Sequence, residues 1–164
     1  MLRHRQRRAR RLCDKPEIYG RVWSVIPGAV VDTGPLVAYF CTDEARHNWA
    51  VQQFANLTPP LLTCEPVLTE TCFLLTRQKV EAWRLLQSLG SGALRIALHL
   101  DAEAEAVRDL MRRYSNIPMS LADACVVRLA EISGLPVCTL DSDFTIYRAG
   151  GRKRVALIIP QRQR

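Results

Sequence analysis

The chain has 164 residues and a formal net charge of +7, and it is 48% hydrophobic, 24% charged and 7% aromatic. This length suits one domain, and the hydrophobic share is enough for a folded core. No apolar run reaches the length of a transmembrane helix, and the arginine-rich beginning lacks the apolar stretch of a secretory signal, so we expect a cytoplasmic protein that does not enter a membrane.

The positive charge lies at the two ends of the chain. Residues 1–28 hold eight Lys/Arg and two Asp/Glu, and residues 151–164 hold five Lys/Arg and no acid, whereas residues 29–150 hold ten Lys/Arg and fourteen Asp/Glu. Basic ends favour contact with a phosphate backbone, although a solvated tail without a function has the same composition. We expect a basic, disordered extension at 1–27, a folded domain at 28–160 and a basic tail at 161–164.

Short apolar runs alternate with helical patterns through the folded domain. Strands are predicted at 29–31, 61–63, 94–98, 137–140 and 155–159, and helices at 34–41, 43–57, 66–77, 79–89, 101–114 and 120–133, with a helical turn at 144–148. The alternation predicts an α/β fold, a single three-layer α/β/α domain with a mostly parallel central sheet. In such sheets the ligand site lies beyond the carboxyl ends of the strands.

The six cysteines show neither a C-x-x-C pair nor a histidine at zinc spacing. Several stand within apolar runs, as Cys138 does in the predicted strand 137–140. The pattern favours buried free thiols in a reducing compartment over disulfides or a zinc site.

Aspartates directly follow two of the predicted strands. Asp32 comes after the first strand, and Asp141 comes after 137–140, with Asp143 two residues further on. Two strands that end in aspartate place both carboxylates on one rim of a parallel sheet. Each aspartate could instead cap the helix or turn that follows it, and the sequence leaves both interpretations open.

Two more acids lie in predicted helices. Asp123 stands three residues after Ser120, as in a capping box, although aspartate is short for that reach and Asp123 could serve a site instead. Glu70 shares a helical stripe with Val67 and Leu74, so we expect it to face inward. A buried carboxylate needs a partner, which is either an arginine or a metal-binding or catalytic cleft.

Four carboxylates on one rim would repel each other, and a divalent cation would relieve that repulsion. Ligands that are all oxygen select a hard ion, Mg²⁺ or Mn²⁺, which can activate water against a phosphodiester. On this hypothesis Asp32, Glu70, Asp123 and Asp141 are both the catalytic and the metal-binding residues. The chemistry then needs no Ser, Cys or His nucleophile.

Four segments resemble the PIN domain and, within it, the VapC-like toxins of toxin–antitoxin pairs. They are VDTGPL at 31–36, PVLTE at 66–70, PMSLADA at 118–124 and TLDSDF at 139–144. Each motif alone is modest, but all four occur in the family's order with family-like spacing, and the resemblance spans roughly residues 29–160. The Arg-rich segment before Gly28 departs from the family pattern.

The resemblance implies a ribonuclease that depends on Mg²⁺ or Mn²⁺. It implies that Asp32, Glu70, Asp123 and Asp141 bind the metal and that Asp143 is a possible fifth member. It also implies supporting hydroxyls on Thr33, Ser120 and Thr139. The family further implies an RNA substrate, a cognate antitoxin protein that covers the active-site groove, and often a homodimer.

The leading hypothesis is therefore a Mg²⁺-dependent endoribonuclease, the toxin of a toxin–antitoxin pair. The alternative is a catalytically silent nucleic-acid-binding module that binds through its basic ends and uses the acids only as structural caps. A phosphatase with Asp32 as nucleophile is disfavoured, because that chemistry would want an aspartate at position 34, which is glycine.

Overall fold

The computed structural model describes residues 28–161. The expectations for the extension at 1–27 and for the tail beyond 161 lie outside the described residues. A five-stranded sheet forms the centre of the fold, in the order β3-β2-β1-β4-β7, and all of its neighbouring pairs are parallel. Its strands are β1 (Val30–Val31), β2 (Leu61–Thr63), β3 (Leu94–Ile96), β4 (Val137–Cys138) and β7 (Leu157–Ile158). The predicted α/β fold with a mostly parallel sheet is confirmed.

The central strand is apolar because both of its faces are covered. In β1, Val30 and Val31 are fully buried, and Val30 pairs with Leu62 on one side and with Val137 on the other. A parallel strand with helices on both faces needs a continuous apolar run rather than an alternating one. The parallel register places the ends of β1 and β4 side by side.

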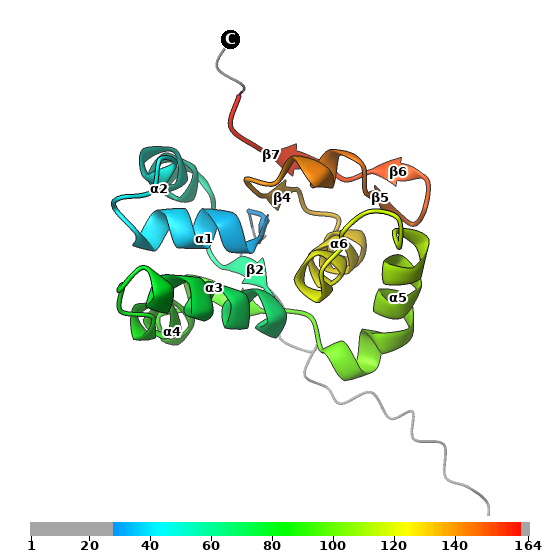
Figure 1. Cartoon of the computed structure of the whole chain (residues 1–164), viewed down its shortest axis with the longest axis horizontal. Coiled ribbons are helices and arrows are strands. Elements are labelled where there is room, and N and C mark those ends of the chain that lie inside the picture. The colour runs from blue at the N-terminus through cyan, green and yellow to red at the C-terminus, as the bar shows by residue number, and fades with distance from the viewer. Residues whose placement is uncertain (1–27, 162–164) are drawn as a thin grey trace, which may run out of the picture.

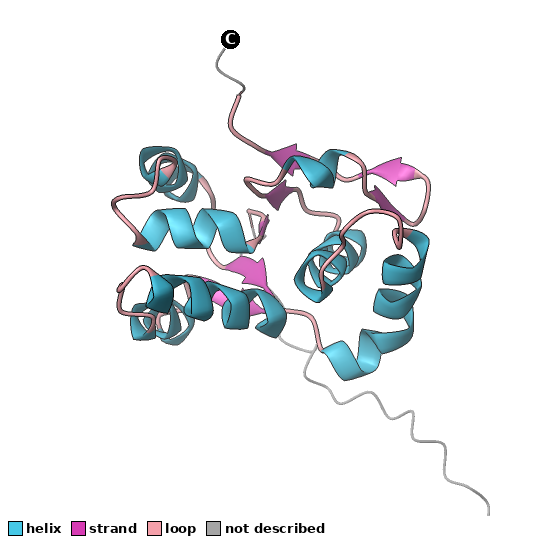
Figure 2. Cartoon of the chain, viewed as in Figure 1, coloured by secondary structure: helices cyan, strands magenta, loops and turns pink. Residues whose placement is uncertain are grey.

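Six α-helices surround this sheet among the described residues. Figure 1 shows the first four on one side of the strands and the last two on the other, and Figure 2 shows the strands running between the two groups. They are α1 (Thr33–Phe40), α2 (His47–Asn56), α3 (Glu65–Arg77), α4 (Trp83–Gly90), α5 (Leu100–Arg113) and α6 (Leu121–Ser133). A 3₁₀-helix, η2 (Ser142–Thr145), follows β4.

Helix α6 has more buried residues than any of the other five and packs against β1 and β4. It ends at Ser133, the predicted last residue, and Gly134 follows with a φ of 70°, the left-handed conformation that favours glycine. Four described cysteines are buried and Cys72 is half-buried, and all five are free thiols, as predicted. Among residues 28–161, no helix is both long and apolar enough to span a bilayer.

Three features differ from the predicted elements, and the first is that the helical turn expected at 144–148 lies at Ser142–Thr145. Helices α2 and α4 begin four residues later than expected, because turns occupy the start of each segment. A small antiparallel hairpin, β5 (Arg148–Ala149) with β6 (Lys153–Arg154), was not predicted. Its turn contains Gly150 and Gly151, both at positive φ, and this Gly-Gly pair is the signal that could have indicated it.

Candidate active site

The carboxyl ends of β1 and β4 place two of the predicted acids on one rim. The Asp32 amide donates to the Cys138 carbonyl at 3.1 Å, which continues the β1–β4 pairing by one residue. Asp32 then turns the chain into α1, while the chain after β4 passes through Thr139 to Asp141. Gly34 allows this approach, because a Cβ there would lie 3.1 Å from the Leu140 side chain.

Asp32 is a buried carboxylate that has no cationic partner among residues 28–161. It is 5% exposed, and it accepts hydrogen bonds from the Thr33 amide and the Thr139 hydroxyl, both at 2.7 Å. Burial raises the pKa of Asp32 to about 6, against the lowering effect of these two hydrogen bonds, and the charges of Asp123 and Glu70 raise it further. The carboxylate of Asp32 therefore interacts electrostatically with Asp123 and Glu70, which come from distant parts of the chain.

Thr139 connects Asp32 to the segment that carries Asp141. Its hydroxyl donates to Asp32 and accepts from the Asp141 amide at 3.0 Å. Asp141 is exposed and accepts from the Asp143 amide at 2.8 Å, which caps η2. Asp32 and Asp141 are thus both caps, as one interpretation of the sequence held, and they also lie on the same rim.

Glu70 does not face the interior, which corrects the prediction. The buried residues of α3 are Val67, Leu68, Thr71 and Leu75. Glu70 lies just off that stripe and is exposed, and Leu74 is only half-buried. The Thr33 hydroxyl donates to Glu70 Oε2 at 2.7 Å, so Thr33 holds Glu70 at the rim beside Asp32.

Asp123 forms a capping box with Ser120 at the start of α6. Its carboxylate accepts from the Ser120 amide at 2.7 Å, and the Ser120 hydroxyl accepts from the Asp123 amide at 3.1 Å, so a complete capping box begins α6. Of the two interpretations left open for Asp123, the capping box is therefore observed, although aspartate is short for that reach. Burial raises the pKa of Asp123, and the charges of Asp141 and Glu70 add to that rise, so the cap also belongs to the acidic rim.

No basic residue among the described ones neutralises this rim. The ion pairs within residues 28–161 join Arg108 to Asp109 and Arg128 to Glu103 and Glu131. None of these three acids belongs to the rim. The arginine partner considered for Glu70 is therefore not found. The acids are held instead by hydroxyls and amides, which leave their negative charge in place.

The donor set consists of carboxylate and hydroxyl oxygens, which suits a hard divalent cation. Within the described part of the chain, however, no three His, Cys, Asp or Glu side chains converge tightly enough to enclose an ion. Mutual repulsion between carboxylates opposes such convergence when no cation is present. The set thus matches Mg²⁺ or Mn²⁺ in its chemistry, and the side chains must move inward to bind one.

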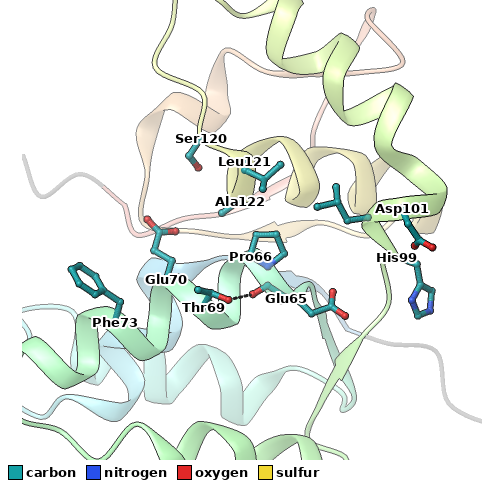
Figure 3. Close-up of a pocket in the computed structure, with 11 residues that line it drawn as sticks. Glu65, Pro66, Thr69, Glu70, Phe73, His99, Asp101, Ser120, Leu121 and Ala122 are labelled. Carbon is teal, nitrogen blue, oxygen red and sulfur yellow. Dashed lines mark hydrogen bonds between the residues drawn. The ribbon is translucent and has the colours of Figure 1, made fainter.

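A groove of about 790 Å³ extends from Glu70 between α3 and the beginnings of α5 and α6. Figure 3 shows Glu70 and Ser120 at one end of it and Asp101 and His99 at the other, with Leu121 between them. Exposed Phe73 and Leu121 give the groove apolar walls. Sequence reasoning did not identify this groove, because three separate segments form it.

Comparison with known proteins decides the family. The family model described as PIN domain matches residues 29–150, most of the chain. The chain belongs to the PIN domain family. Its structure is similar to that of Mycobacterium tuberculosis VapC20, described as a toxin that cleaves the sarcin–ricin loop, with a TM-score of 0.64 and 25% identity over 72% of this chain and 93% of VapC20. No curated protein matches the sequence.

The site residues predicted from the sequence can now be located in this PIN domain. Asp32, Glu70, Asp123 and Asp141 come from four separate segments, and the charges of Glu70, Asp123 and Asp141 contribute to the raised pKa values of Asp32 or Asp123. Asp143 lies two residues after Asp141, in the first turn of η2. The three predicted hydroxyls each bond an acid or its backbone.

Proposed function

We propose that this PIN domain is a metal-dependent endoribonuclease and the toxin of a toxin–antitoxin pair. The observation that carries the proposal is the acidic rim, where four carboxylates gather at the carboxyl ends of parallel strands without a basic partner among the described residues. Charges arranged in this way attract a divalent cation, and the family model and the similarity to VapC20 support the same chemistry.

Asp32, Glu70, Asp123 and Asp141 would hold the cation. A bound Mg²⁺ or Mn²⁺ supplies Lewis acidity that activates water and stabilises the leaving oxygen at a phosphodiester. Asp32 forms the floor of the site, because it is buried and fixed by two hydrogen bonds. With a pKa of about 6, Asp32 is mostly ionised at pH 7 and above, so its charge is available there.

The hydroxyls orient the acids without reducing their charge. Thr33 donates to Glu70, and Thr139 joins Asp32 to the Asp141 amide. The Ser120 amide holds one oxygen of Asp123. Each bond fixes a carboxylate by a neutral donor, which leaves the negative charge for a cation.

RNA is the proposed substrate, and the name of VapC20 as a toxin that cleaves the sarcin–ricin loop supports this choice. A cognate antitoxin is the proposed partner, and the groove beside Glu70 offers it an apolar and acidic surface. A homodimer is proposed on the family resemblance. The RNA sequence and the cleavage position are left open.

The test is cleavage of total RNA by the purified full-length chain with Mg²⁺, with Mn²⁺ and with EDTA. We expect discrete fragments with either metal, none with EDTA, and none from Asp32→Asn at saturating Mg²⁺. Circular dichroism should show that Asp32→Asn is folded. Cleavage in EDTA, or a normal rate in folded Asp32→Asn, would overturn the proposal.

The same preparation tests the silent binding module. Such a module would bind RNA with a steep salt dependence set by its basic residues and would give no product with any metal. The acidic rim supports the nuclease instead, because capping alone does not require Asp32 to be buried within reach of two other acids.

A further inference from the structure

Basic side chains gather where the end of α5 meets the β5–β6 hairpin (Figure 1), and the proposed chemistry at the rim does not use them. Neither of these two segments contains an acid. Five of the bases are exposed and one, Arg148, is half-buried. The six bases, called the basic patch below, are Arg112, Arg113, Arg148, Arg152, Lys153 and Arg154.

Two contacts hold the end of α5 against the hairpin. A Cβ added at Gly151 would lie 3.1 Å from Arg113 Nη1, so the guanidinium of Arg113 lies directly against the glycine turn. The Tyr114 hydroxyl accepts from the Arg148 amide at 2.8 Å, which ties the residue after α5 to the start of β5. The two segments therefore form one surface, although they are distant in the sequence.

The described residues do not neutralise the charge of the basic patch. None of the ion pairs within residues 28–161 involves a member of the patch. Glu131 accepts from the Gly150 amide in the hairpin turn at 2.6 Å, but this acid is already paired with Arg128 at 2.9 Å. Arg148 and Arg154 are direct cross-strand partners, and like charges in that position destabilise a sheet. A bound anion would offset this repulsion.

The hairpin part of the patch is joined to the rim by η2. Nη1 of Arg148 donates to the carbonyls of Thr145, Ile146 and Tyr147 at 2.9, 2.6 and 2.9 Å, so its guanidinium is fixed at the end of η2. The beginning of η2 is capped by Asp141, an acid of the rim. A 3₁₀-helix of this length extends only about 8 Å. A base of the patch and an acid of the rim thus lie at opposite ends of one short helix.

The α5 part of the patch leads to the rim as well. After Arg113, the segment 114–119 runs to Ser120, whose amide holds Asp123 at 2.7 Å. Both segments that carry the patch therefore also carry or position an acid of the rim. A nucleic-acid strand with its scissile phosphate at the rim would continue over the patch.

We propose that the basic patch binds the phosphate backbone of RNA beside the scissile bond and so positions the strand across the acidic rim. The inference rests on the proposed function, because the rim supplies the cleavage. Five of the six bases are arginines, whose guanidinium forks form paired hydrogen bonds with phosphate. Backbone contacts of this kind fix the register of a strand without reading its sequence.

The test neutralises the three exposed bases of the hairpin in the variant Arg152→Gln/Lys153→Gln/Arg154→Gln. Binding of a fluorescein-labelled single-stranded RNA is followed by anisotropy in EDTA. At about 0.1 M salt we expect a dissociation constant roughly 10–100-fold above the wild type, and a salt slope smaller by about 2, since each phosphate contact on a single strand contributes about 0.7. The melting temperature should equal or exceed that of the wild type, because the repulsion between Arg148 and Arg154 is removed.

Arg46→Gln/Lys79→Gln/Arg84→Gln is the matched control. It removes the same charge from exposed positions beside α2, α3 and α4, on the other side of the sheet (Figure 1). Its RNA affinity should stay within about threefold of the wild type, because salt screens distant exposed charges. Equal losses in the two variants would overturn the inference, since binding would then follow net charge, and so would unchanged affinity in the hairpin variant.

Cleavage with Mg²⁺ separates the inference from the proposed function. In the hairpin variant the loss should appear in KM, as expected when a contact binds substrate and transition state alike, and a loss confined to kcat would overturn the inference. A wild type that cleaves RNA while the hairpin variant binds it equally well rejects the inference alone. A wild type that binds RNA through the patch but cleaves it with no metal rejects the nuclease alone.

Poly-glutamate is the probe for an acidic protein as the rival occupant. It should bind the wild type more weakly than RNA of equal charge, and equally tight binding that the hairpin variant also loses would overturn the inference. Should the hairpin variant fail to fold, photo-cross-linking of RNA containing 4-thiouridine to the wild type supplies the measurement. Cross-links located by mass spectrometry should include residues 112–119 or 145–154, and cross-links confined to other segments would reject the assignment.

Discussion

Two clusters of acids in this molecule are balanced in opposite ways. On the surface between α5 and α6, Glu103 and Glu131 share one arginine, which contacts them at 2.8 and 2.9 Å. At the sheet rim, the hydrogen-bond donors that the described part of the chain gives Asp32 and Asp123 are hydroxyls and amides alone. The first cluster contains its own cation, and the second does not.

The difference shows how a structural cluster can be told from a functional one. An acid that serves only the fold is stabilised when its charge is neutralised nearby, as Arg128 does for Glu131. An acid that binds a cation must be oriented while its charge remains. Neutral donors achieve that, and burial raises the pKa values of Asp32 and Asp123 against the lowering effect of these hydrogen bonds.

Substituting one acid in each cluster gives the largest contrast. Glu70→Gln should reduce RNA cleavage by about 100-fold or more, because a lost metal ligand removes several kcal/mol of transition-state stabilisation. Glu103→Gln should stay within about twofold of the wild type, since Glu103 pairs with Arg128 away from the rim. Initial rates at saturating Mg²⁺ check both, and equal losses would remove the distinction between the clusters.

Added metal should stabilise only the molecule whose rim is intact. At 100 times its dissociation constant, Mg²⁺ or Mn²⁺ should contribute about 2.7 kcal/mol, which raises the melting temperature by roughly 5–10 °C in a domain of this size. Asp123→Asn should lose most of this rise, whereas Glu103→Gln should keep it. A wild-type melting temperature that is the same in EDTA and in metal would argue against a cation site.

The sequence predicted which segments form the acidic rim better than it predicted the orientation of the side chains there. Strand runs such as Val30–Val31 and the aspartates after them follow from local patterns, so Asp32 and Asp141 could be placed together. Glu70 was placed in the right helix but on the wrong stripe, because the helix shows several apolar spacings and only packing decides which is buried.

Features that depend on several segments at once could not be predicted. The groove beside Glu70 combines three helices, and the basic patch joins the end of α5 to a hairpin that was not predicted. The reach of Asp123 to the Ser120 amide depends on local backbone angles that residue type alone does not determine. Distance along the chain carries little information about such contacts.

Asp32→Asn should stabilise the metal-free protein in a pH-dependent way. The pKa of Asp32 is about 6 in the folded state against an ordinary 3.8, so the folded protein binds more protons between about pH 4 and pH 6. Wild-type stability therefore falls as pH rises through this window and stays lower above it. The variant lacks this loss, so at pH 7.5 it should be more stable by about 1–3 kcal/mol.

Urea unfolding in EDTA from pH 4 to pH 8 measures that difference. The advantage of Asp32→Asn should shrink to a small remainder near pH 4, where the carboxyl is protonated in the folded state and close to its ordinary pKa of 3.8 in the unfolded state. Asp43→Asn, an exposed acid in a turn, should track the wild type across the range. A constant advantage at every pH would mean that the variant acts through packing and not through the charge of Asp32.

Removing the arginine of the structural cluster should give the smallest effect, and one of opposite sign. Arg128→Met keeps an apolar stem but leaves Glu131, whose side chain is 12% exposed, with only the Gly150 amide as a donor. Because Glu103 and Arg128 remain partly solvated, we expect a loss of about 1–2 kcal/mol at pH 7 that shrinks at acidic pH as the glutamates protonate. RNA cleavage by the folded variant should be unchanged, since the structural cluster lies outside the rim. A loss of cleavage without a loss of stability would show that the two clusters are not independent.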